Sequence, residues 1–181
     1  MRMKMLAVAL AVALTTFVVP TFVQGAPSGL DQALSSGGLR TAVRLDPPKP
    51  QPQPPSPIRQ VLDLVNAERA ARGLPAMVAD QRLDLAAQRH SQDQASMRRM
   101  SHTGSDGSTL AQRIDRVGFP WRSAAENVAY GYASAAAVMT GWMNSTGHRL
   151  NILSSNTHIG VGLAYTADGV PYWTQVFATP R

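Results

Sequence analysis

The chain has no cysteine, few aromatic residues and only two glutamates among its 181 residues. Without cysteine, no disulfide, no zinc site built on thiolate and no lipid-attachment cysteine is available. A domain of more than about 100 residues can bury enough apolar surface to fold without such cross-links. The length therefore predicts one domain whose stability comes from side-chain packing.

Several signatures of well-defined enzymes are also missing. The sequence contains no G-x-S-x-G elbow, no P-loop, no H-E-x-x-H and no dinucleotide fingerprint. The positive charge is nearly all arginine and is scattered along the chain, whereas nucleic-acid binding needs clustered charge. We therefore expect no nucleic-acid partner, and a weak attraction to an anionic envelope surface instead.

Residues 1–25 have the pattern of a Sec-type signal peptide. Arg2 and Lys4 precede an apolar run of fourteen residues, Leu6 to Val19, and the predicted cleavage site lies before Ala26. The alternative is an N-terminal membrane anchor, but a span needs about twenty residues. Cleavage would lower the formal net charge from +6 to +4 and give a secreted or periplasmic protein without a transmembrane anchor.

Residues 26–57 are predicted to be a Pro-rich, disordered linker. Seven of the twelve residues from Asp46 to Pro57 are proline, which favours an extended polyproline II spacer over a fold. Such a run can alternatively be a ligand for another module. Ser56 and Pro57 then give an N-cap and a proline in the first helical turn, so the folded domain is predicted over 58–179.

Within that domain, periodicity predicts four helices followed by a hairpin. The helices span 58–73, 81–97, 110–118 and 135–142, with Asp80 and Ser134 as N-caps. The strands span 159–165 and 172–177, and a further strand is possible over 125–130. The fold class is therefore α+β, with about four helices packed on a small antiparallel sheet.

The candidate functional residues are His102, Glu126 and His148, each beside the end of a predicted element, where functional groups tend to lie. Glu126 has apolar neighbours, and a buried carboxylate needs a partner, a hydrogen bond or a metal. Composition alone does not decide between a structural role and a site role for it. The remaining ionisable residues have ordinary interpretations: an exposed Glu68–Arg69 pair, a core histidine at His90 and a strand-edge histidine at His158.

Seven segments follow one another over about residues 58–179: "LVNAERAARGLPAM", "AAQRHSQDQASM", "SHTGSDGST", "ENVAYG", "WMNSTGHRLNIL", "IGVGLAY" and "YWTQVF". Their order resembles the bacterial branch of the CAP superfamily, also called SCP-like domains. The resemblance implies an α-β-α sandwich with a shallow cleft that holds two histidines and two acids. By motif, His102 and His148 match the two histidines, and Glu126 matches the acid of the "GEN" sequence.

The chain departs from that pattern at two positions. Ala125 replaces the "GEN" glycine, and Ser145 stands where the family has its second acid. Asp106 is the nearest substitute in sequence, since the only acid after Glu126 is Asp168. Gly147 is expected to let the chain leave the fourth helix so that His148 faces the cleft.

Three functions follow from these residues. The first is an exported, monomeric binding module for a lipid, a cell-wall component or another protein, with His102, Glu126 and His148 holding a divalent metal such as Zn²⁺ or Mg²⁺. The second is a peptidase or esterase that uses the same residues, or Ser145 as a nucleophile beside His148. The third is a purely structural envelope domain, so enzymatic activity is left open.

Overall fold

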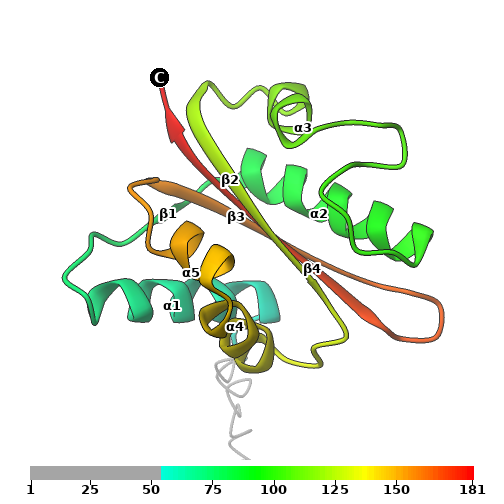
Figure 1. Cartoon of the computed structure of the whole chain (residues 1–181), viewed down its shortest axis with the longest axis horizontal. Helices are drawn as coiled ribbons and strands as arrows, with labels where there is room; N and C mark the ends of the chain where they lie inside the picture. Colours follow the sequence, from blue (N-terminus) through cyan, green and yellow to red (C-terminus); the bar gives the residue numbers. More distant parts are fainter. Residues whose placement is uncertain (1–53) are drawn as a thin grey trace, which may run out of the picture. The chain divides into compact units, whose positions relative to one another are not determined.

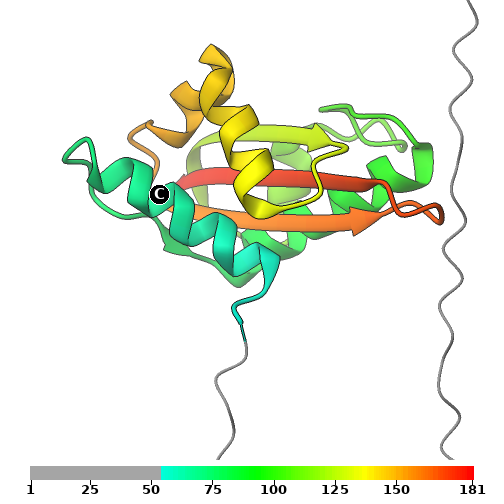
Figure 2. The ribbon, with the colours of Figure 1, turned by 90° about the horizontal axis from the view of Figure 1, so that it is seen from below.

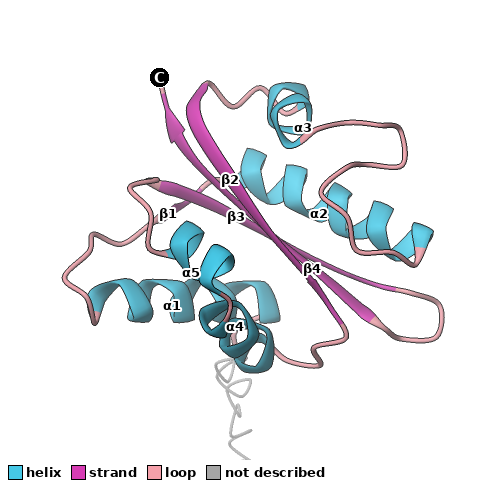
Figure 3. Ribbon diagram, in the orientation of Figure 1, coloured by secondary structure: helices cyan, strands magenta, loops and turns pink. Residues whose placement is uncertain are grey.

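The structure is a computed structural model that describes residues 54–181. The predicted signal peptide and most of the predicted linker lie outside the described residues. Four strands form one sheet in the order β1 (Val78–Ala79), β3 (His158–Tyr165), β4 (Pro171–Pro180) and β2 (Trp121–Tyr130). The β1–β3 pair is parallel and the other two pairs are antiparallel (Figures 1 and 3).

Helices cover both faces of this sheet (Figure 2). One layer contains α1 (Pro57–Ala70), α4 (Ala135–Asn144) and α5 (Thr146–Ile152), and the opposite layer contains α2 (Gln81–Met97) and α3 (Leu110–Arg116). The arrangement is the three-layer α-β-α sandwich that the resemblance implied. None of the helices within residues 54–181 is long and apolar enough to cross a membrane.

The predicted helix starts are confirmed by their caps. The side chains of Ser56, Asp80 and Ser134 each accept a backbone N–H from the first turn of α1, α2 and α4. An N-cap side chain satisfies one of the donors that a helix start leaves free, so these residues locate the starts from local chemistry alone.

Three expectations need correction. Residues 54–181 contain five helices because the chain bends at Ser145 and starts the short helix α5, which contains His148. The sheet is mixed because the two-residue strand β1 pairs in parallel with the start of β3. His158 is consequently not at a sheet edge, since it pairs with Val78 on one side and Ala178 on the other.

Strand β4 forms the centre of the core. Because successive side chains of a strand point to opposite faces, Trp173 and Phe177 pack against the layer of α1, α4 and α5. Val176 and Ala178 pack with Leu83 against the layer of α2 and α3. Burial on both faces explains why β4 is apolar through most of its length.

Two glycines on β3 let α2 approach the sheet closely. A Cβ added at Gly160 would lie 2.0 Å from the backbone carbon of Leu83, and one at Gly162 would lie 2.3 Å from that of Ala87. The clashing atoms are backbone, so they can move only if the whole helix moves.

We expect Gly162→Ala to lower the free energy of unfolding by about 2 kcal/mol, because overpacking a rigid contact costs about that much. Gly147→Ala is the matched control, since its Cβ would meet open space within α5. That control should leave stability unchanged or raise it by up to about 1 kcal/mol. Urea unfolding measures both variants, and equal stabilities would contradict the close approach of α2 to β3.

Candidate functional site

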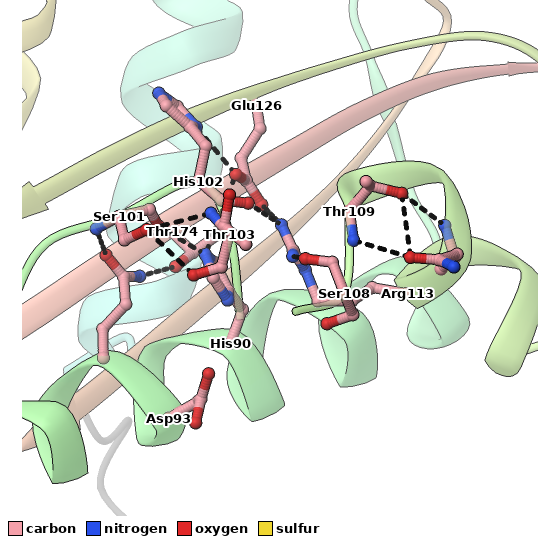
Figure 4. A network of polar contacts seen from close by, with 12 residues as sticks. His90, Asp93, Ser101, His102, Thr103, Ser108, Thr109, Arg113, Glu126 and Thr174 are labelled. Carbon is pink, nitrogen blue, oxygen red and sulfur yellow. Dashed lines mark hydrogen bonds and ion pairs between the residues drawn. The ribbon is translucent and has the colours of Figure 1, made fainter. Parts of the chain in front are cut away.

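Glu126 lies on β2 and joins side chains from three other parts of the chain (Figure 4). Its Oε1 is 2.8 Å from His102 Nδ1, and its Oε2 accepts a bond of 2.7 Å from Arg113 Nη2. His90 Nε2, on α2, lies 3.8 Å from Oε1. We call these four residues the Glu126 cluster.

The cluster solves the problem of a carboxylate inside the fold. The Glu126 side chain is only 3 % exposed, and a buried charge is strongly unfavourable unless it is paired and hydrogen-bonded. Arg113 supplies the opposite charge and is itself buried. Its guanidinium also donates to the carbonyl oxygens of Ser108 and His102, so it ties the loop 98–109 to the sheet.

The two histidines of the cluster differ in their electrostatics. The hydrogen bond to Glu126 raises the pKa of His102, whose side chain is 61 % exposed. Burial lowers the pKa of His90, and its Nε2 lies 2.8 Å from the carbonyl oxygen of Ser101. A carbonyl can only accept, so this geometry assigns the proton of neutral His90 to Nε2.

His148 lies on α5, in the helix layer opposite the one that contains α2 and α3. The break between α4 and α5 occurs at Ser145, with extended backbone angles of −98° and 122°, and Gly147 is inside α5. The expectation that Gly147 ends the fourth helix is therefore wrong. Asn127 donates to the carbonyl oxygen of His148 at 3.1 Å and accepts from Asn151 at 2.8 Å, so two side-chain amides hold α5 against β2.

A pocket of about 490 Å³ lies beside His148, and we call it the cleft. Its walls are largely apolar or aromatic and come from the end of β2, from α4 and from the loop after α2. His148 and Ser145 are the polar side chains on its α5 side. Burial first, and then the nearby His102, lower the pKa of His148. The residues that line the cleft are Met100, Val128, Ala129, Tyr130, Gly131, Tyr132, Gly141, Trp142, Ser145 and His148.

The structure thus brings the predicted site residues only partly together. His102 and Glu126 are in direct contact, and His148 lies close enough to His102 for the two imidazoles to influence each other. Asp106 does not replace the missing acid, because it pairs with Arg116 at 2.6 Å. The side chain of Ser145 caps no backbone N–H at the start of α5. The pKa of His148 is lowered by burial and by the nearby His102, and not by a hydrogen bond to Ser145.

A divalent metal does not fit the site as built. Both oxygens of Glu126 are already engaged by His102 and Arg113. Within residues 54–181, no group of three or more histidine and acidic side chains is arranged to hold a metal ion. Two imidazoles without a free carboxylate provide fewer ligands than a zinc site uses.

Sequence reasoning missed Arg113 and assigned His90 to the core alone. A signal for Arg113 was present, because it shares one face of α3 with Leu110 and Val117, at spacings of three and four residues. An arginine on an apolar stripe must find an acceptor inside the fold. His90 is a core histidine as predicted, with 1 % exposure, but its ring also lies against Glu126.

Comparison with known proteins decides the family. The model of the cysteine-rich secretory protein family, CAP, matches residues 62–177. The chain belongs to the CAP family. The uncharacterized protein YkwD of Bacillus subtilis (strain 168) is 38 % identical over 120 residues, which are 66 % of this chain and 46 % of YkwD. The uncharacterized membrane protein YlbC of the same organism is 35 % identical over 119 residues, 64 % of this chain and 34 % of YlbC. This CAP chain therefore spans less than half the length of either relative.

Solved structures agree with the family assignment. An extracellular protein with an SCP domain from Bacillus anthracis str. Ames is 33 % identical, with a TM-score of 0.62 over 68 % of this chain and 40 % of that one. An outer surface protein from Borrelia burgdorferi has a TM-score of 0.65 at 21 % identity, over 69 % of this chain and 93 % of that one. The second likeness shows the shared CAP fold alone.

The raised pKa of His102 predicts a pH dependence for this CAP domain. A group whose pKa is raised by folding contributes stability below its unfolded pKa of about 6.5 and loses it as pH rises through the folded pKa. His102→Asn keeps an amide donor for Glu126 without a titrating ring. The stability difference between wild type and variant should therefore be larger at pH 6 than at pH 9 in urea unfolding. A difference that grows with pH would contradict the His102–Glu126 bond.

The metal-site prediction can be tested at the position where the family acid is missing. Zn²⁺ should bind Ser145→Glu more tightly than wild type, because a new carboxylate would stand one helical turn before His148. Isothermal titration of Zn²⁺ and Mg²⁺ into wild type, Ser145→Glu and Ser145→Gln separates charge from size. Tight binding to wild type that is lost on His102→Ala and His148→Ala would restore the metal site predicted from sequence.

Proposed function

We propose that this CAP domain is an exported, monomeric binding module whose cleft holds a small amphipathic molecule of the lipid class. The observation that carries the proposal is the cleft itself, about 490 Å³ with apolar and aromatic walls and few polar groups on one side. Ligand sites in proteins commonly have this size and this ratio of apolar to polar lining.

The polar side of the cleft favours a neutral or weakly polar headgroup. Burial lowers the pKa of His148 and so favours the neutral ring, which can donate one hydrogen bond and accept one. The charge of Glu126 is matched by Arg113. Hydroxyl and ester oxygens suit such a surface, and a chain or ring would lie against the aromatic walls.

Export is supported by the charged start and apolar run of residues 1–25. The solved CAP relative from Bacillus anthracis is described as extracellular, and the Borrelia burgdorferi protein as an outer surface protein. A lipid of the cell envelope is the amphipathic molecule that such a protein would meet.

Binding of monooctanoyl glycerol, measured by isothermal titration, tests the ligand class. Glycerol alone should not bind, and each added methylene should tighten binding roughly fourfold if it is buried. Tyr132→Ala should weaken binding, whereas Tyr165→Ala, a tyrosine 57 % exposed and outside the cleft, should not. Equal effects of the two substitutions, or tighter binding of a chitooligosaccharide, would overturn the proposal.

Gly141→Ala is a sharper variant for the same test. Its Cβ would lie 2.6 Å from the Tyr132 hydroxyl oxygen, so the tyrosine ring must move while the backbone stays in place. Alanine favours a helix over glycine by up to about 1 kcal/mol. Weaker lipid binding without a loss of stability would therefore locate the ligand at Tyr132.

A hydrolase is the second candidate, because Glu126 holds the exposed His102 ring through Nδ1 and leaves Nε2 without a partner among residues 54–181. A carboxylate that orients an imidazole is the usual arrangement of a general base. A panel of ester and peptide substrates against wild type, His102→Ala and His148→Ala tests it. Turnover that is lost in His102→Ala would favour this function over binding alone.

A further inference from the structure

A second pocket lies between α2, α3 and the loop 98–109, and His90 and Arg113 of the Glu126 cluster form part of its wall. It has a volume of about 260 Å³ and is separate from the cleft, since the two share no lining residue. We call it the α2–α3 pocket. Its lining residues are Ala86, Arg89, His90, Asp93, Ser105, Asp106, Ser108, Arg113, Arg116 and Val117.

One face of α2 and one face of α3 supply most of the side chains that line the pocket. Ala86, Arg89 and Asp93 recur at spacings of three and four residues on α2, so they share one face. Arg113 and Arg116 share a face of α3 by the same spacing. Three arginines from two helices therefore line one hollow.

The acids of this pocket are already engaged by the protein. Asp93 accepts bonds from the backbone N–H and the hydroxyl of Ser105. Asp106 accepts from Ser108 N–H at 2.9 Å and from Arg116 at 2.6 Å. Both oxygens of each carboxylate are therefore engaged within the protein.

The guanidinium groups that line the pocket, in contrast, keep N–H donors without a partner within residues 54–181. Within residues 54–181 no acid pairs with Arg89, which is exposed at the pocket. Over the same range, Arg116 bonds Asp106 through Nη1 alone, and the Nε of the 93 % buried Arg113 has no partner. A guanidinium offers five donors and no acceptor, so an acceptor-rich group is the complement of this pocket.

We propose that the α2–α3 pocket binds a small oxyanion, a phosphate or carboxylate group, held by Arg89 and Arg116 over the buried wall formed by Arg113 and His90. Planar guanidinium groups match the oxygens of such anions in pairs. The site is independent of the proposed lipid cleft. Arg113 nevertheless belongs to both the pocket wall and the Glu126 cluster. The anion would therefore lie beside the residue that bonds Glu126, whose other oxygen contacts His102.

The NMR resonances of the histidine rings of the full chain provide the test. His90 lines this pocket, His148 lines the cleft, and neither His102 nor His158 lines either one. Inorganic phosphate and succinate are titrated in separate arms, against sodium chloride of equal ionic strength to correct for screening. The His90 signal, inside the pocket, should shift and saturate, while that of His158, which packs on Phe119, should not. The arm that saturates at lower concentration identifies the oxyanion.

Arg89→Gln should weaken the affinity about tenfold, the loss expected for one charged hydrogen bond. Arg99→Gln is the matched control, since Arg99 is exposed just beyond α2 and does not line the pocket. It should change the affinity less than about twofold, because it removes distant charge alone. Binding of monooctanoyl glycerol should be unchanged in both variants, which separates this site from the cleft.

Three results would overturn the proposal. Absence of a saturable shift in both arms would show that no oxyanion binds. An equal loss of affinity in Arg89→Gln and Arg99→Gln would show attraction by net charge alone. A saturating shift of His148 with His90 unchanged would place the anion in the cleft instead.

Discussion

Replacing Arg69 by methionine should lower the free energy of unfolding by about 4 kcal/mol. The Arg69 side chain is buried on α1, and its guanidinium donates to the carbonyl oxygens of Pro75, Ile152 and Ser154, each at 2.8 Å. Methionine fills much of the same volume but leaves these carbonyls without that donor. Each buried acceptor left unsatisfied costs about 1–3 kcal/mol.

The effect should reach beyond α1 because Arg69 joins three separate segments. Its acceptors lie in the turn after α1, at the end of α5 and in the connection to β3. Arg69→Lys should recover only part of the stability, since one ammonium group cannot reproduce the planar fork.

Arg72→Met is the matched control for urea unfolding. Arg72 is exposed and pairs with Glu68 at 2.6 Å, which corrects the predicted Glu68–Arg69 pair. Its loss should change stability by at most about 0.5 kcal/mol, as for other exposed pairs. Similar losses in the Arg69 and Arg72 variants would show that the three carbonyl contacts contribute little.

Glu126→Gln should destabilise the domain by about 3 kcal/mol, because it leaves a buried ion pair with one partner. The substitution keeps the shape of the side chain but removes the negative charge that compensates buried Arg113. An uncompensated buried charge costs several kcal/mol. Thermal and urea unfolding of the full chain measure the loss.

A double-mutant cycle with Arg113→Met isolates the pair. Removing both partners should cost less than the two single losses together, by about 1–3 kcal/mol, because residues in one network are coupled. Additive losses would contradict the pairing. The cycle also bears on function. If the two substitutions change stability alone, the Glu126 cluster holds the loop 98–109 in place and need not act on a ligand.

Much of the fold is already present in local sequence patterns. Ser56, Asp80 and Ser134 identify helix starts, because a capping hydroxyl or carboxylate acts within three residues of its own position. Alternation from Ile159 to Tyr165 predicts β3, since the period of two depends only on the strand itself. The pairing partners were harder to predict: the two-residue β1 has no periodicity to reveal it.

The candidate site was predictable by residue type and not by contact. His102, Glu126 and His148 were identified from their sparse, loop-side positions and their place in the family order. Glu126 pairs with Arg113, and Asp106 pairs with Arg116 instead of joining the site. Both pairings depend on how α3 packs against β2. No local pattern contains that packing.

The sequence by itself determined the composition, the starts of α1, α2 and α4, the strands of the hairpin and the family, and it predicts a signal peptide. Only the tertiary structure decided which charges are buried together, and hence that the one carboxylate of Glu126 is shared by His102 and Arg113. The physical reason is the range of the interactions. Caps and periodicity act over a few residues, whereas the burial of Glu126 depends on segments 13 and 24 residues away that meet only in the folded chain.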